Sequence, residues 1–113
     1  MLRGITELRS LPYLTRTNES VTADTAICEI RGDIENNDVT FVSFQAAFED
    51  AGKLYIVDEN GNTMYLTDPN NDWPSRYQIL STFMLQSGTT VSLKYSATTT
   101  MTKLIIVQGG GVF

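Results

Sequence analysis

The feature that most constrains the fold is an alternation of side chains with a period of two over short stretches of the sequence. In residues 39–48, one face of an extended chain would carry Thr40, Val42, Phe44, Ala46 and Phe48. In residues 89–96 the same period places Val91, Leu93 and Tyr95 together. Side chains of a β-strand point alternately to its two faces, so both stretches predict half-buried strands.

Turn residues separate these stretches at regular intervals. Residues 53–57 and 63–67 flank the segment 58–62, whose Asn60-Gly61 pair tolerates the positive φ angles of a tight hairpin. Further strands are expected at 77–85 and 101–107, and the nearly continuous apolar run of the latter predicts that both its faces are covered. About seven to eight short strands predict an all-β protein, an antiparallel β-sandwich of jelly-roll type.

The ends of the chain differ from this pattern. We expect an N-terminal arm at residues 1–18, a β-sandwich domain at 19–108 and a Gly-rich tail at 109–113. A period of three in the arm fits a short helical turn or an extended segment laid on a surface, and it equally fits side chains that close one end of the domain's own core. The apolar residues of both ends are the expected partner-binding set: Leu2, Ile5, Leu8, Leu11, Leu14, Val112 and Phe113.

Charge is distributed unevenly along the chain. Residues 1–16 carry three arginines and one glutamate, a balance of +2, whereas the remainder has a balance of −7 and the whole chain −5. An acidic body repels the phosphate backbone, so we expect no nucleic-acid partner. A basic arm on an acidic body favours contact with an acidic neighbour, including another copy of the chain.

Residue types needed for common catalytic chemistry are missing. The sequence has no histidine and a single cysteine, Cys28, which lies in a predicted strand and is interpreted as a small buried apolar residue. No apolar run approaches the length of a membrane span, and Glu7 and Arg9 interrupt any signal-peptide core. We therefore expect no enzyme activity, no cofactor, no catalytic residue, no metal ligand and no membrane partner.

One long irregular loop, residues 68–76, holds the remaining candidates. Asp68, Asn70 and Asp72 alternate as in a calcium-binding loop, but such side chains more often cap their own backbone, so no metal is assigned. Trp73 and Tyr77, with Asp72 beside them, are the possible ligand-binding residues. Their rings would stack on a carbohydrate if exposed, whereas a lone tryptophan in a small β-protein more often packs in the core.

Residues 53–58, Asn60-Gly61 and 83–93 together resemble small jelly-roll modules of bacteriophage virion proteins, such as head decoration proteins, head fibres and tail-associated domains. The final turn, alternating strand, threonine-rich loop and residues 103–107 are similar to the last strands of trimeric tumour-necrosis-factor-like and C1q-like heads. The resemblance carries no functional residue. It implies a virion structural protein made in a bacterial cytoplasm, which binds other virion proteins or copies of itself as a homo-oligomer such as a trimer.

Overall fold

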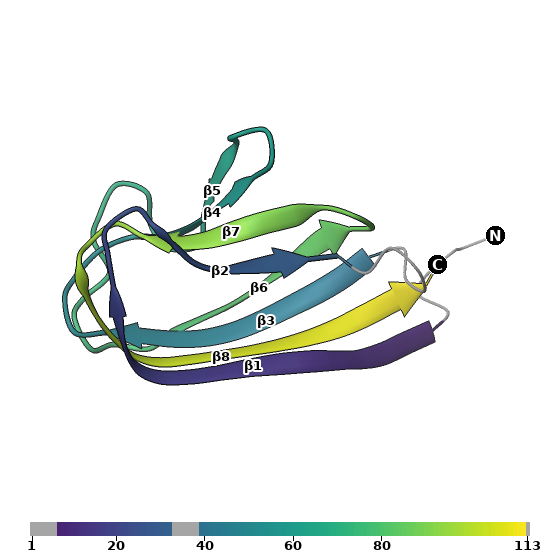
Figure 1. Ribbon diagram of the computed structural model, residues 1–113, viewed down its shortest axis with the longest axis horizontal. Helices are drawn as coiled ribbons and strands as arrows, with labels where there is room; N and C mark the ends of the chain where they lie inside the picture. Colours follow the sequence, from purple (N-terminus) through teal and green to yellow (C-terminus); the bar gives the residue numbers. More distant parts are fainter. Residues whose placement is uncertain (1–6, 33–38, 113) are drawn as a thin grey trace.

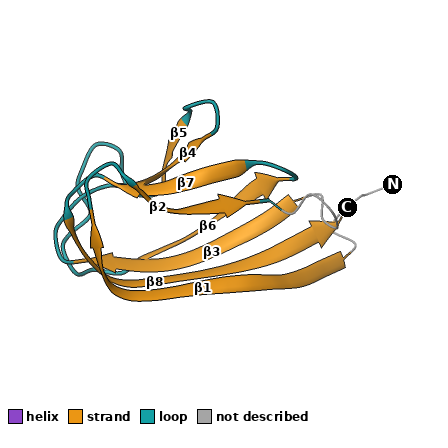
Figure 2. Ribbon diagram, viewed as in Figure 1, coloured by secondary structure: helices purple, strands orange, loops and turns teal. Residues whose placement is uncertain are grey.

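The computed structural model describes residues 7–32 and 39–112, which form eight β-strands and no helix (Figure 2). No helix that could cross a membrane is therefore found within these ranges. The strands are β1 (Glu7–Val21), β2 (Ala26–Arg31), β3 (Val39–Phe48), β4 (Leu54–Asp58), β5 (Thr63–Tyr65), β6 (Ile79–Gln86), β7 (Thr90–Tyr95) and β8 (Thr99–Val112).

The eight strands form two four-stranded antiparallel sheets that face each other (Figure 1). The order is β1-β8-β3-β6 in sheet A and β2-β7-β4-β5 in sheet B. Along the chain the pairing is nested, because β1 pairs with β8, β2 with β7, β3 with β6 and β4 with β5. Pairing of β3 with β8 and of β4 with β7 then completes each sheet. This arrangement is a jelly roll, and it confirms the predicted β-sandwich.

The core lies between the sheets and follows the period of two. All five residues placed on the inner face of 39–48 are buried, as are Val91, Leu93 and Tyr95 from the opposite sheet. The rings of Phe48 and Tyr95 join the two layers, since they stack with centroids 3.8 Å apart and planes within 5° of parallel. Contact of this kind removes large apolar surfaces from water and provides the main stabilisation of the domain.

The predicted hairpin at 58–62 is confirmed in detail. Asp58 accepts hydrogen bonds from the backbone N–H groups of Asn60 and Asn62, at 2.9 and 2.8 Å, and Gly61 has a φ of +84°. These bonds hold the pKa of Asp58 below its ordinary value, chiefly through the Asn62 side chain and then its backbone. The side chain of Asp58 therefore holds the turn by local hydrogen bonds.

The ends of the chain are organised differently from the expectation. Residues 7–18 belong to β1 rather than to a separate arm, and residues 109–112 belong to β8 rather than to a flexible tail. The two strands pair from Glu7 with Val112 to Val21 with Thr99. Each end pairs with a long neighbouring strand, which satisfies the backbone groups that face it, and the three-residue apolar period carries no information about that pairing. Leu2, Ile5 and Phe113 lie outside the described residues.

Candidate interaction surfaces

Four regions of the structure bear on function. The first is the loop that carries Trp73, whose backbone exchanges two hydrogen bonds with Gly52, at 2.7 and 3.2 Å. The indole N–H donates to the carbonyl oxygen of Tyr77 at 3.1 Å, and the half-buried ring packs against the core. Tyr77 itself is 67% exposed. The loop thus holds the ring of Trp73 against the core and leaves the ring of Tyr77 at the surface.

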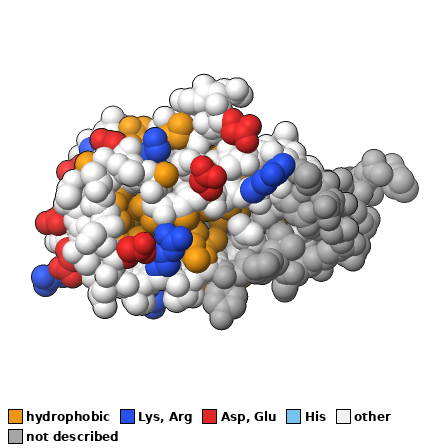
Figure 3. Space-filling view, in the orientation of Figure 1, with side chains coloured by type: hydrophobic (Ala, Val, Ile, Leu, Met, Phe, Trp, Pro, Cys, Tyr) orange, Lys and Arg blue, Asp and Glu red, His pale blue; other side chains and the backbone are white. Residues whose placement is uncertain are grey.

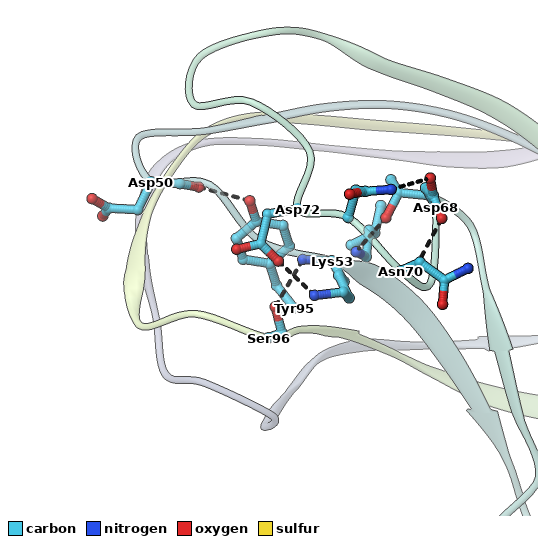
Figure 4. Close-up of polar contacts among 10 residues, drawn as sticks. Asp50, Lys53, Asp68, Asn70, Asp72, Tyr95 and Ser96 are labelled. Carbon is cyan, nitrogen blue, oxygen red and sulfur yellow. Dashed lines mark hydrogen bonds and ion pairs between the residues drawn. The ribbon is translucent and has the colours of Figure 1, made fainter.

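Acidic side chains of the same loop are engaged by their neighbours (Figure 4). Asp68 accepts a hydrogen bond from the side chain of Asn71 at 2.9 Å and another from the backbone N–H of Asn70 at 2.8 Å, and these bonds lower its pKa. Asp72 accepts from the Lys53 ammonium at 2.6 Å, and this bond raises the pKa of Lys53. Within the described ranges, no three His, Cys, Asp or Glu side chains form a group that could hold a metal ion. The carboxylates of Asp68 and Asp72 therefore stabilise the loop itself, one through local hydrogen bonds and the other through an ion pair.

The second region is buried beneath this loop and is also drawn in Figure 4. Tyr95 is 1% exposed, and its hydroxyl donates to the carbonyl oxygen of Asp50 at 2.7 Å. Burial, followed by the nearby carboxylates of Asp72 and Asp50, raises the pKa of Tyr95 to about 12. A Cβ added to Gly52 would come within 2.7 Å of the Tyr95 ring, so the chain passes this ring only as glycine. Tyr95 is a structural residue of the loop end.

The third region is a groove of about 350 Å³ between the edges of β1 and β2. Its lining combines apolar side chains with charged and polar ones, and Figure 3 shows apolar side chains gathered on one face of the molecule with basic and acidic ones beside them. Arg16 crosses the opening and donates to the carbonyl oxygen of Ile27 at 2.9 Å, which ties the two edges together. The residues of the groove are Leu14, Arg16, Cys28, Glu29, Ile30, Ile106 and Gln108.

Cys28 and Leu14 are the sequence candidates that reach this groove. Both are partly buried and pack against the core. Burial raises the pKa of the Cys28 thiol, an effect that Arg16 opposes and Glu19 reinforces. Cys28 is therefore partly buried rather than fully buried as predicted, and its contact with the core agrees with the interpretation as a small apolar residue.

The fourth region, the outer face of sheet A, holds residues that sequence reasoning did not single out. Leu80 and Met84 of β6 are 68% and 61% exposed, and Val107 of β8 is 51% exposed. Phe41 of β3 lies opposite Met84 and is half-buried. The expectation that both faces of 101–107 are covered is wrong for this outer face. In 79–85 apolar residues also occupy both alternating sets, a pattern that does not distinguish a covered outer face from an exposed one.

Of the expected partner-binding residues, only some lie in the described strands. Leu8 and Leu11 belong to β1, opposite Gly111 and Gln108, and Val112 belongs to β8 opposite Glu7. The structure therefore brings the two chain ends together at one end of sheet A. It separates them from the Trp73 loop, which lies at the other end of the sandwich with most of the connecting loops (Figure 2).

Comparison with known proteins extends this description at the level of the fold. The sequence matches no known protein family and no curated protein. A chain from the structure reported as "Bacillus endospore appendages form a novel family of disulfide-linked pili" superposes with a TM-score of 0.51. The sequences are 13% identical, and the alignment covers 100% of this chain and 97% of the other. The protein is accordingly a jelly-roll β-sandwich that shares its fold with a chain of that appendage structure.

Proposed function

We propose that this protein is a non-catalytic structural subunit that acts through protein–protein contacts, including contacts with copies of itself. The observation that carries this proposal is the group of large apolar side chains exposed on the outer face of sheet A. Exposed apolar patches of this kind mark contact surfaces in soluble proteins. In contrast, the carboxylates of Asp58, Asp68 and Asp72 are engaged in turns and an ion pair.

The setting we propose is an ordered assembly of repeated subunits. The resemblance of residues 53–58, 60–61 and 83–93 to virion modules supports a capsid decoration, fibre or tail-associated protein, assembled in the host cytoplasm. The likeness to the endospore appendage chain supports a surface filament instead, because those appendages are described as pili. Both settings require a subunit that binds other subunits through its surface.

Size-exclusion chromatography with light scattering tests the proposal on the purified chain, followed by electron microscopy of the associated fraction. We expect a concentration-dependent oligomer, and we expect Met84→Ser to weaken it. Met64→Ser is the matched control, since Met64 is also exposed, at 48%, but lies on β5 in the other sheet. A chain that stays monomeric at every concentration and binds no virion or appendage protein would contradict the proposal.

A carbohydrate- or receptor-binding module is the second candidate, and the exposed ring of Tyr77 favours it. Tyr77 lies in a loop rich in amide side chains, which suit sugar hydroxyls, and Asp72 and Trp73 precede it. Tyr77→Ala is the informative variant for a glycan array, because Tyr77 is not part of the core. Loss of a glycan signal in that variant, with an unchanged fold, would support this candidate, and the absence of any signal in the parent protein would exclude it for the glycans tested.

A further inference from the structure

Each sheet of the sandwich ends in two edge strands, and three of the four edges carry features that oppose pairing with another strand. The β1 edge contains Pro12, which has no N–H to donate, and its register shifts between Leu11 and Leu14. Proline and irregular register are common devices by which natural sheets prevent edge-to-edge association. The β1 edge is therefore a poor template for a further strand.

The edges of sheet B are blocked in a similar way. The β2 register shifts between Ala26 and Cys28, and its exposed residues include Glu29 and Arg31. The carbonyl oxygen of Ile27 is taken by the Arg16 guanidinium. At the other edge, β5 is only three residues long. Charge, a bulge and short length each disfavour strand addition.

The β6 edge has none of these features. Its eight residues, Ile79–Gln86, include no charged residue, no proline and no glycine. They pair with β3 without a shift from Ala46 opposite Ile79 to Val39 opposite Gln86. On its other side, β6 is hydrogen-bonded to no strand in the described part of the chain. A regular, uncharged edge of this length presents a row of backbone groups that a further strand can satisfy.

We propose that the β6 edge pairs antiparallel with β6 of a second copy, around a two-fold axis at Thr82. This inference rests on the proposed self-association and specifies its surface. In this register Thr82 faces its own counterpart, while Leu80 faces Met84 of the second copy and Ile79 faces Leu85. The remaining pairs are Ser81 with Phe83 and Gln78 with Gln86.

The occupant is a second copy because the apolar residues of β6, apart from Phe83, are placed symmetrically about Thr82. A two-fold axis perpendicular to the sheet keeps the outer face of one copy continuous with the outer face of the other. Every apolar residue then lies opposite an apolar residue, except Phe83, and polar Thr82 lies on the axis. The outward residues Leu80 and Met84, now 68% and 61% exposed, would form one apolar row across both copies.

A charge-exchange experiment at the axis tests this geometry. Thr82→Lys places two ammonium groups opposite each other, about 5 Å apart at Cβ, and Thr82→Glu does the same with carboxylates. Each variant alone should dissociate at least about tenfold more readily than the parent dimer. An equimolar mixture of the two should restore the dimer, because only the mixed pair is complementary.

Ser43→Lys is the matched control. Ser43 is exposed on the same face and lies opposite Thr82 on the adjacent strand. Strand spacing would keep its two copies roughly 14 Å apart across the axis, beyond the screening length of physiological salt. This variant should therefore remain dimeric. Circular dichroism of each variant verifies that the fold is unchanged.

Cross-linking tests the register independently of charge. Two proteins are made in a Cys28→Ala background, one with Leu80→Cys and the other with Met84→Cys. Each protein alone should form few disulfide dimers, and a mixture of the two should form many, because residue 80 of one copy faces residue 84 of the other. An oligomer that persists in both Thr82 variants, or cysteines that cross-link no better when mixed, would overturn the β6 pairing and leave the proposed function intact. A parent chain that is monomeric at all concentrations would overturn both self-association and this interface.

Discussion

Tyr95 stabilises the loop end of the sandwich through two separate contacts. Its ring stacks on Phe48 of the opposite sheet, and its hydroxyl donates to the Asp50 carbonyl oxygen. Tyr55 has a comparable role at the surface, where its hydroxyl donates to Asp24. Both phenols are held in their neutral, hydrogen-donating form, and the pKa of each is raised to about 12.

The raised pKa values predict a loss of stability at high pH. The unfolded chain releases its phenolic protons near the ordinary value of 10.0, whereas the folded chain keeps these two until about pH 12. The stabilisation that these two phenols contribute should therefore be complete below pH 10. The free energy of unfolding should fall as the pH rises from 10 to 12. Urea titrations monitored by circular dichroism across this range measure the effect.

Tyr95→Phe isolates the contribution of the buried residue. At neutral pH it should cost about 1 kcal/mol for the lost hydrogen bond, and above pH 10 its stability should fall less steeply than that of the parent. Tyr77→Phe is the control, because Tyr77 is exposed and lies outside the core. Equal pH dependence in the parent and Tyr95→Phe would show that Tyr95 ionises freely in the folded state.

Individual strands were predictable because their signal is local. The alternation in 39–48 and the Asn60-Gly61 turn identified β3 and the β4–β5 hairpin, and the residues placed on the inner face are buried. The length of β1 and β8 was not predictable, because it depends on pairing between residues about a hundred positions apart. The same applies to Trp73, whose half-buried position is set by Gly52, a residue in another loop.

The loop between β5 and β6 provides the second prediction. Trp73→Ala removes a ring that packs against the core, so it should lower the free energy of unfolding by about 2 kcal/mol, and Trp73→Phe by roughly half as much. Because Trp73 is the only tryptophan, the measurement uses far-ultraviolet circular dichroism in urea. Tyr77→Ala, in the same loop but exposed, should change stability by less than about 0.5 kcal/mol. Full stability in Trp73→Ala would show that the ring is a free surface group.

For the whole molecule, the candidate surfaces arise from topology rather than from any motif. The nested pairing of the jelly roll makes β6 an edge strand and turns Leu80, Met84 and Val107 outward on one sheet. Sequence pattern marks 77–85 as a strand but does not distinguish an edge from a centre, since both contain apolar residues on both faces. The predicted sites at the chain ends, by contrast, followed from local composition alone.

The net charge of the molecule determines how its association should depend on salt. Two copies that each carry −5 repel one another, whereas the β6 edge is uncharged. Added salt screens the repulsion and leaves apolar strand pairing intact, so the parent dimer should tighten as the ionic strength rises. Contact between the basic residues 1–16 and an acidic body would weaken instead.

The mixed Thr82→Lys and Thr82→Glu dimer provides the internal control, because its exposed opposite charges should make it less salt-tolerant than the parent. Sedimentation equilibrium at low and moderate salt decides between these directions, and a parent dimer that dissociates on adding salt would assign self-association to the charged N-terminal residues.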